Sequence, residues 1–174
     1  MEIRKGRPTD LDDIEKIYER IHDNEEKGLS TTGWIRRVYP TGKTAQDALG
    51  RGDLFVMTDH GRTVAVAVIN HIQVPEYRNV TWRYEAKDAE ILVLHGLAVD
   101  PQEKGKGYGR SFVSFYEEEA RRQGCVALRM DTNVRNTRAR KLYRSLGYEE
   151  IGTVPCNFNG IPDVELVCLE KGLT

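Results

Sequence analysis

A glycine-rich, basic stretch has the residue types and spacing that most directly suit chemistry. The ten residues QEKGKGYGRS, at positions 102–111, contain three glycines and three cations. They follow the apolar run ILVLHGLAVDP, which starts at Ile91, and precede the amphipathic run FVSFYEEEARRQG. The stretch therefore lies between a predicted strand and a predicted helix, where it is either a tight turn or a loop that binds phosphate.

The context of this loop favours phosphate binding. Gly105 and Gly107 lack the Cβ atoms that would keep a ligand away from the main chain. A helix N-terminus offers free N–H groups and the positive end of the helix dipole. Lys104, Lys106 and Arg110 add positive charge around that point. The spacing differs from the dinucleotide-binding pattern G-x-G-x-x-G, so we expect another phosphate ligand.

The charge distribution supports a small anionic ligand. The chain has 26 Lys and Arg against 27 Asp and Glu, which predicts no general attraction to nucleic acid or to acidic membranes. Residues 102–144, by contrast, contain 11 cations and 5 anions. The segment RMDTNVRNTRARKLYR has cations at helical spacing but lacks the interleaved aromatics of single-strand RNA binders. RNA binding is therefore the weakest alternative.

The remaining composition bounds the class of protein. With 174 residues, the chain is expected to form one domain over 1–174. Its three cysteines, Cys125, Cys156 and Cys168, form no C-x-x-C pair and predict buried thiols in a reducing compartment, with neither a disulfide nor a metal site. No apolar run has the length of a membrane span, and MEIRKGRPTD lacks the apolar core of a signal peptide. We expect a cytoplasmic protein without a membrane partner.

The elements that would position the loop alternate between strand and helix. Residues 74–90 are expected to be a polar connection or a sheet edge. Strands are predicted at 1–6, in a hairpin over 54–72 with its turn at 59–61, and at 91–99, 126–132, 148–154 and 164–171. Helices are predicted from Thr9 or Asp10 to Ile21, around 45–49, and over 107–123 and 136–146. This order predicts an α/β fold with a mixed sheet.

Two blocks of the sequence resemble the GCN5-related N-acetyltransferase (GNAT) superfamily. Gln102-x-x-Gly105-x-Gly107 resembles its Q/R-x-x-G-x-G/A signature. NTRARKLYRSLGY, at 136–148, is similar to its N-x-x-A-x-x-L-Y-x-x-x-G-F/Y helix. The blocks lie within about 91–152, and the N-terminal half has no sharp motif. The resemblance implies a centrally splayed, mixed sheet of about six or seven strands flanked by about four helices.

The resemblance also implies acetyl-CoA as co-substrate and no metal. In the family, the loop amides hold the pyrophosphate, and the pantetheine arm enters where two parallel strands separate. There the arm pairs with the main chain of a strand that corresponds to Leu97–Val99, and the helix asparagine, here Asn136, touches it. The implied cofactor-binding residues are Leu97, Ala98, Val99, Gln102, Lys104, Gly105, Lys106, Gly107, Tyr108, Gly109, Arg110 and Asn136.

A family member of this kind transfers an acetyl group to a primary amine of a small molecule or peptide by direct attack in a ternary complex. The amine must be neutral, the oxyanion needs a hydrogen-bond donor, and the departing thiolate is helped by a proton. Tyr143 matches the family tyrosine that protonates the sulfur. Its alternative role is aromatic packing under the sheet.

Two residues are candidates for the base. His95 lies two residues before Leu97, where the similar arylalkylamine N-acetyltransferases have a histidine on their proton path, and its imidazole titrates near neutrality. Its alternative role is that of a hydrogen-bonded core residue. Glu90 is the second candidate, since many relatives use a carboxylate in this strand, but its position at the polar start of the strand also suits a solvated residue. Bulk water is the third possibility.

The sequence does not identify the amine acceptor. Four aromatics fall in the loops that wall the acceptor pocket in the family, or else they pack in the core: Trp34, Tyr39, Tyr77 and Trp82. Three acids could attract a cationic amine or form a solvated helix end: Asp23, Glu25 and Glu26. A homodimer is left open. The alternative to an enzyme is a catalytically silent coenzyme A-binding module that acts as a sensor or scaffold.

Overall fold

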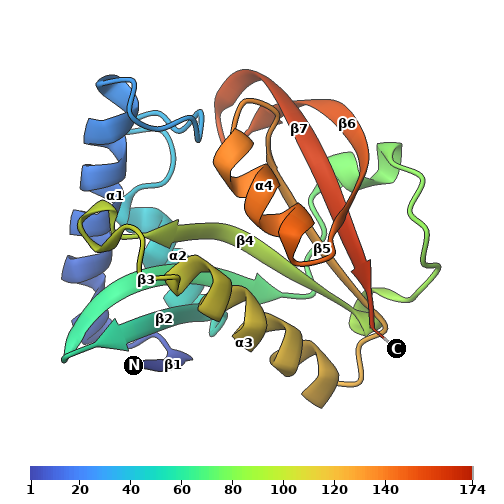
Figure 1. The fold of residues 1–174 in the computed structure, drawn as a ribbon, viewed down its shortest axis with the longest axis horizontal. Coiled ribbons are helices and arrows are strands. Elements are labelled where there is room, and N and C mark those ends of the chain that lie inside the picture. Colours follow the sequence, from blue (N-terminus) through green and yellow to red (C-terminus); the bar gives the residue numbers. More distant parts are fainter. Residues whose placement is uncertain (174) are drawn as a thin grey trace.

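Seven strands form a single mixed sheet in the order β1-β2-β3-β4-β5-β7-β6 (Figure 1). The structure is a computed structural model, and it describes residues 1–173. β4 and β5 run parallel, whereas all other neighbouring strands are antiparallel. The strands are β1 (Glu2–Lys5), β2 (Leu54–Asp59), β3 (Arg62–Asn70), β4 (Ile91–Val99), β5 (Ala127–Asn133), β6 (Glu149–Phe158) and β7 (Ile161–Gly172). The prediction of an α/β fold with a mixed sheet is confirmed.

In the described part of the chain, four α-helices cover the two faces of the sheet. α3 and α4 lie on one face, and α1 and α2 lie on the other, over the N-terminal strands (Figure 1). Their bounds are α1 (Leu11–Glu26), α2 (Gly42–Arg51), α3 (Tyr108–Arg122) and α4 (Thr137–Ser145). Across residues 1–173, none of these helices combines the length and the apolar character needed to cross a bilayer.

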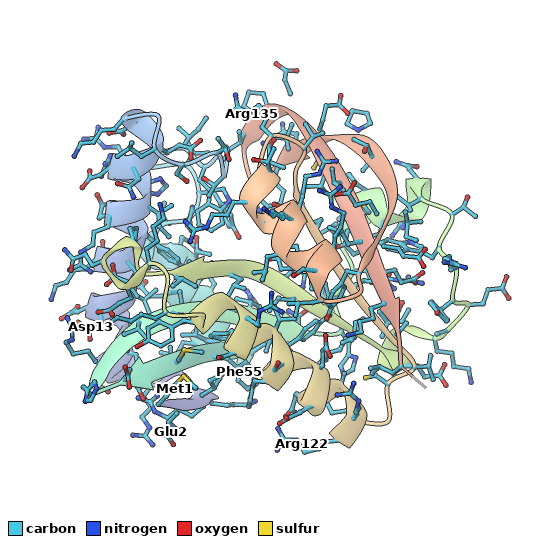
Figure 2. All side chains as sticks on the ribbon, in the orientation of Figure 1. Met1, Glu2, Asp13, Phe55, Arg122 and Arg135 are labelled. Carbon is cyan, nitrogen blue, oxygen red and sulfur yellow. The ribbon has the colours of Figure 1, made fainter. Side chains whose placement is uncertain are left out.

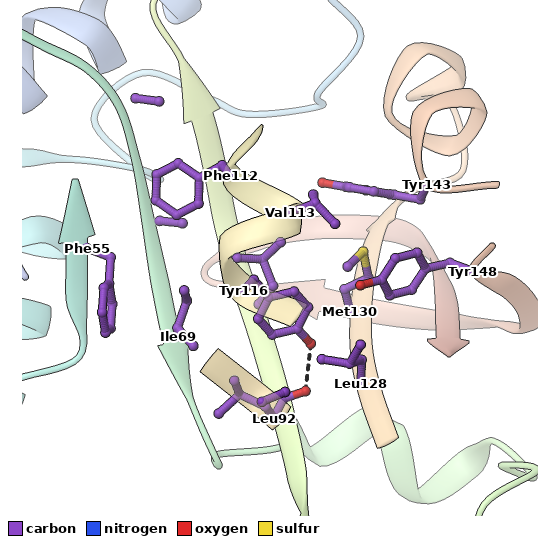
Figure 3. Close-up of a cluster of buried hydrophobic side chains, with 14 of the residues drawn as sticks. Phe55, Ile69, Leu92, Phe112, Val113, Tyr116, Leu128, Met130, Tyr143 and Tyr148 are labelled. Carbon is purple, nitrogen blue, oxygen red and sulfur yellow. Dashed lines mark hydrogen bonds between the residues drawn. The ribbon is translucent and has the colours of Figure 1, made fainter. Parts of the chain in front are cut away.

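The core under α3 holds the two parallel strands together. Phe112, Val113 and Tyr116 of α3 are fully buried against β4 and β5 (Figure 3). The Tyr116 hydroxyl donates to the carbonyl oxygens of both Leu92 and Arg129, at 2.6 and 3.0 Å. One side chain therefore links β4 to β5 just before the strands part.

The strands part after only four residue pairs. The parallel register runs from Ile91 opposite Ala127 to Leu94 opposite Met130, and no later pair joins β4 to β5 in the described residues. Beyond this point β4 stays with β3 and β5 stays with β7. A register shift between β3 and β4 coincides with Gly96, whose φ is 59°. The extra residue bends β4 away from β5, because a bulge turns the strand that contains it. The splay that the family resemblance implies is thus present.

The segment 73–90 lies over the second face of the sheet, beside the region that α1 and α2 cover. It contains two short three-ten helices, 75–79 and 88–90, and no strand. Tyr77 and its neighbours pack on Ile91, Ala127 and the β6–β7 hairpin. The sheet-edge alternative was therefore wrong. Aromatic side chains anchor this polar-looking stretch to the sheet face instead.

The C-terminal hairpin is longer than predicted. β6 continues through Pro155 to Phe158, and β7 already begins at Ile161. β6 is the outer strand of the sheet, so the missing N–H of Pro155 interrupts no ladder to a further strand. The extended hairpin brings Phe158 to the opening between β4 and β5.

Candidate active site

The start of α3 has the geometry of an anion-binding site. Gly107 is the N-cap with φ 76°, and no side chain caps this helix end in the described residues. Gly105 also has a positive φ, 86°. A Cβ added at either glycine would meet no protein atom within 4 Å. Packing therefore does not require glycine here, whereas the left-handed backbone does, and the N–H groups of the first helical turn stay accessible to a ligand.

The cations around this loop are not equivalent. Lys106 is paired with Glu103, a buried carboxylate that Arg62 also contacts at 2.8 Å. Arg110 donates to Ser145 Oγ at 3.1 Å and so connects α3 to α4. Lys104 is exposed and forms no salt bridge in residues 1–173. In the described residues, Lys104 and Arg110 thus both lack an acidic partner, whereas Lys106 has one.

Three other predicted cofactor residues contribute backbone or packing. Tyr108 is buried in the core, and its hydroxyl donates to Asp59, so only its main chain faces the loop. A Cβ at Gly109 would lie 3.4 Å from a Leu142 methyl, an ordinary packing distance, so Gly109 lies at the contact between α3 and α4. The N–H of Gln102 donates to Asp100 Oδ1, which shapes the turn before the glycines.

A cavity of about 70 Å³ lies where β4 and β5 separate. It is lined from both faces of the sheet and from the long loops, by Trp34, Leu97, Asp131, Asn136, Tyr143 and Phe158 among others. The structure thus brings together four residues that the sequence predicted as functional, Trp34, Leu97, Asn136 and Tyr143. It adds Asp131, which the sequence reading did not single out.

Tyr143 is the predicted proton donor, and it lines this cavity. Its side chain extends from α4, with the hydroxyl directed toward β4 (Figure 3), and is 7% exposed. In the part of the chain that the structure describes, the hydroxyl has no hydrogen-bond partner. Burial and the negative charge of Asp131 raise the pKa of Tyr143 well above its usual value. The phenol therefore remains protonated at physiological pH, as a proton donor must.

Asp131 is a candidate functional residue that the sequence did not single out. It belongs to the end of β5, and the Tyr77 hydroxyl donates to its Oδ2 at 2.6 Å. Burial raises the pKa of Asp131 to about 6, although the hydrogen bond from Tyr77 opposes this shift. A carboxylate with this pKa is a suitable general base near neutrality. The available signal was an acid at the carboxyl end of a buried strand, five residues before Asn136.

Asn136 has a capping role that leaves part of its amide free. Its Oδ1 accepts from the N–H of Ala139 at 3.3 Å, which caps α4. The amide nitrogen keeps both of its donor positions. Because Asn136 also lines the cavity, it can cap a helix and contact a ligand at the same time.

Comparison with known proteins settles the family. The sequence pattern of the "Acetyltransferase (GNAT) family" matches residues 12–148. The chain belongs to the GNAT family.

Relatives and solved structures agree with this assignment. An uncharacterized N-acetyltransferase of Methanocaldococcus jannaschii is 24% identical over 148 residues, 85% of this chain and 60% of that protein. A "[Ribosomal protein bS18]-alanine N-acetyltransferase" of Haemophilus ducreyi is 33% identical over 70 residues, 40% of this chain and 48% of that protein. The matched parts therefore span less than two thirds of either relative.

The fold matches solved GNAT structures over nearly the whole chain. A GNAT-family acetyltransferase of Streptococcus agalactiae superposes with a TM-score of 0.84 at 21% identity, covering 99% of this chain and 95% of that one. A Salmonella typhimurium protein solved "with its cofactor Acetyl-CoA" has a TM-score of 0.69 at 20% identity, covering 100% and 94%. At these identities the likeness concerns the fold.

Within this GNAT domain, His95 lies outside the set of residues that line the cavity. Its Nε2 donates to Asn70 Oδ1 at 2.8 Å, and Asn70 in turn donates to Asp53. Burial lowers the pKa of His95 to about 4, against the opposing charge of Asp53. The imidazole is therefore neutral above this pH. These contacts favour the core role, and a part in catalysis stays a prediction.

Glu90 lies at the other end of β4 from the cavity. Its side chain accepts from the N–H of Lys87 at 2.9 Å and closes the short three-ten turn before the strand. Six residues, or roughly 20 Å of extended chain, separate it from Gly96 at the bulge. Its assignment as a base stays a prediction, whereas Asp131 lines the cavity.

Trp34 of loop 27–41 lines the cavity, and Tyr39 of the same loop packs beside it. Trp34 and Tyr39 pack edge to face at 5.9 Å, and Tyr39 packs in the same way on Phe158 at 5.2 Å. A Cβ at Gly96 would lie 2.8 Å from the Tyr39 hydroxyl oxygen. The bulge glycine therefore makes room for the loop. Trp82, the fourth predicted wall residue, lies elsewhere, stacked against Arg129.

The three acids at the end of α1 hold this loop. Glu25 accepts from the N–H groups of Thr32 and Gly33, both at 3.0 Å. Its carboxylate also lies 3.9 Å from Arg135, which is labelled in Figure 2. Asp23 and Glu26, together with Glu19, surround the guanidinium of Arg36. Glu25 therefore fixes the part of the loop that lines the cavity. Asp23 and Glu26 stay more than half exposed, which agrees with a solvated helix end, and attraction of a cationic amine stays a prediction.

Proposed function

We propose that this protein transfers the acetyl group of acetyl-CoA to a primary amine by direct attack in a ternary complex. The observation that carries the proposal is the pairing of two groups at the opening between β4 and β5. Tyr143, a protonated phenol, comes from the α4 face, and Asp131, a carboxylate with a pKa of about 6, comes from the strand beside it. An acid and a base of this kind are what acetyl transfer to an amine requires.

The residues present fit acetyl-CoA. Within residues 1–173, β4 has no strand partner on its β5 side after Leu94, which leaves main-chain groups at Leu97–Val99 to pair with an extended ligand arm. The uncapped start of α3 offers N–H groups and a positive dipole to a pyrophosphate, with Lys104 and Arg110 nearby in sequence. Asn136 would contact the arm at the cavity.

The chain's own residues would handle the protons. Acetyl-CoA supplies an acetyl group activated as a thioester. Above pH 6, Asp131 takes a proton from the bound ammonium, and the freed nitrogen forms a bond to the carbonyl carbon. As the carbon–sulfur bond breaks, Tyr143 gives its proton to the sulfur. The proton held by Asp131 then returns to the Tyr143 phenolate through solvent, so that the protein ends unchanged.

For the acceptor, we propose a small-molecule or peptide amine. The cavity is small and aromatic-walled, so it suits the end of a slender chain rather than a bulky group. The name of the H. ducreyi relative makes the α-amine of a peptide that begins with alanine the first acceptor to try. Polyamines, aminoglycosides and free amino acids form the comparison set.

The test is release of free coenzyme A thiol from acetyl-CoA across this panel, with wild type and Asp131→Asn. We expect one amine class to give turnover, and Asp131→Asn to lower kcat/KM about 10²–10⁴-fold while calorimetry shows unchanged acetyl-CoA affinity. Asp13→Asn is the matched control, because Asp13 is exposed on the outer side of α1 (Figure 2). Acetyl-CoA binding without turnover on any amine would instead favour the silent coenzyme A-binding module.

A further inference from the structure

A buried tyrosine from a segment distant in sequence forms a hydrogen bond with Asp131. Tyr77 is 2% exposed, and its hydroxyl donates to Asp131 Oδ2 at 2.6 Å. The other oxygen, Oδ1, has no hydrogen-bond partner within residues 1–173, while Asp131 lines the cavity. One oxygen of the carboxylate is thus held from behind, and the other is free for a cavity ligand.

The segment that contains Tyr77 is anchored to β5 by a buried cation. Arg129, two residues before Asp131 on the same strand, forms a buried ion pair with Glu170 at 2.9 Å. Its guanidinium lies 4.2 Å from the ring centroid of Trp82 and donates to the Tyr84 carbonyl. Trp82 in turn donates from Nε1 to the Tyr77 carbonyl at 2.9 Å. These contacts fix Tyr77 relative to the strand that contains the carboxylate.

Other titratable groups around Asp131 do not replace this contact. No Lys, Arg or His forms a salt bridge with Asp131 in the described chain. The side chains that influence the pKa of Asp131, or whose pKa its charge influences, are all acids, phenols or thiols. They are Glu76, Tyr77, Tyr39, Tyr143, Cys156 and Cys168. Tyr77 is therefore the one side-chain donor that stabilises the ionised carboxylate.

We propose that Tyr77 is a positioning residue for acetyl transfer: its hydroxyl holds one oxygen of Asp131 so that the other receives the proton of the incoming amine. The proposal rests on the proposed function, in which Asp131 is the base. Tyr77 touches neither the amine nor the acetyl group. It acts through Asp131, by orienting the carboxylate and by keeping it ionised over a wider pH range.

The test compares Tyr77→Phe with wild type in two measurements. The first is the pKa of Asp131 in the free protein, from carbon-13 NMR of labelled aspartate carboxyls, with the resonance assigned by its loss in Asp131→Asn. The second is the acidic limb of kcat/KM against pH with the best acceptor. Loss of a hydrogen bond to a charged group should raise the pKa by about one to two units, and the limb should move by the same amount.

Matched variants keep the result interpretable. Tyr148→Phe removes a buried hydroxyl that donates to Glu117, on the α3 face, and should leave the Asp131 pKa unchanged. Incorporation of 3-fluorotyrosine at position 77 preserves packing but makes the phenol more acidic, and it should lower the Asp131 pKa. This second variant also serves if Tyr77→Phe fails to fold.

The outcomes distinguish the role of Tyr77 from the role of Asp131 as the base. An Asp131 pKa that is the same in wild type and in both Tyr77 variants overturns the role of Tyr77. A pKa that moves while the activity limb stays in place supports the control of Asp131 by Tyr77, but overturns Asp131 as the base and with it that part of the proposed function. Movement of both supports both.

Discussion

On the α3 side of the separated strands, the groups that fit acetyl-CoA all come from residues 97–143, and most of them are main-chain groups. The opposite side is assembled from loop 27–41, segment 73–86 and the β6–β7 hairpin, which meet only in the fold. There the important contacts join side chains, such as Tyr77 to Asp131 and Glu25 to the loop that contains Trp34. The first side is a backbone site, and the second is a side-chain site.

This difference has a physical origin. A pyrophosphate can be bound by N–H groups that every residue has, provided that the backbone adopts the correct turn, and glycine spacing specifies that turn locally. An amine acceptor must be recognised by particular side chains, which the fold collects from segments far apart in the chain. Substitutions on the two sides should therefore fail in different ways.

The largest expected effect on activity is at Tyr143, which lies between the backbone site and the side-chain site. Tyr143→Phe keeps the ring and removes only the hydroxyl, so kcat should fall about 10²–10⁴-fold while the affinity for acetyl-CoA persists. Steady-state kinetics and calorimetry measure the two quantities. A wild-type rate in this variant would return Tyr143 to the aromatic packing role.

In the backbone site, substitution of Gly107 should weaken the binding of acetyl-CoA. A valine there must adopt a φ of 76°, which costs about 1–3 kcal/mol of strain or moves the N–H groups at the start of α3. We expect acetyl-CoA affinity to fall roughly 10–100-fold by calorimetry. Gly124→Val is the matched control, since Gly124 follows the other end of α3 with φ 74° and equally open surroundings.

That control should lose stability but keep its affinity for acetyl-CoA. If the two variants lost affinity equally, the loss would reflect general strain in α3, and the glycine loop would not be the pyrophosphate site.

In the side-chain site, the ionised carboxylate of Asp131 should lower the stability of the folded protein. The pKa of Asp131 is raised from 3.8 to about 6, so the folded protein binds this proton more tightly than the unfolded chain. Its contribution is present below pH 4 and is lost as the pH rises through 6. Asp131→Asn should therefore be more stable than wild type by about 1–3 kcal/mol at pH 8, and this gain should disappear toward pH 4. Denaturant unfolding at both pH values measures it.

For a second buried aspartate, Asp10, we expect the opposite dependence of stability on pH. Burial alone would raise the pKa of Asp10, but the hydrogen bonds from Arg4 and from the N–H of Arg7 hold it below its usual value. Asp10→Asn should lower stability at pH 8, and the loss should shrink as the pH falls below 4. If both variants changed stability in the same direction at pH 8, Asp131 would be a structural residue like Asp10.

The smallest effect on activity is expected at His95. Its pKa is lowered to about 4, so it stays neutral throughout the working range, and His95→Gln should leave the kcat/KM profile between pH 5 and 8 unchanged. The unfolded chain binds this proton already near pH 6.5, so wild-type stability should fall between pH 6.5 and 4, and less so in the variant. A selective rate loss of His95→Gln at low pH would instead support the proton relay.

Much of the fold was predictable because its signals are local. The hairpin turn near Gly61, the glycine before α3 and the helix α4 that Asn136 caps each depend on residues that are close in sequence. The mixed sheet and the position of Tyr143 followed from them. The lengths of β6 and β7 were underestimated, because whether a strand tolerates Pro155 depends on its place at the sheet edge.

By itself, the amino-acid sequence determined two local parts of the molecule: the glycine loop at the start of α3 and the helix that presents Tyr143. Each is specified within one or two helical turns of chain, where φ preferences and hydrophobic spacing act directly. Only the tertiary structure decided that Asp131 faces the opening, that Tyr77 holds it and that His95 turns to Asn70. The register of distant strands and the packing of segment 73–90 set those contacts, and neither can be predicted from the residues around Asp131.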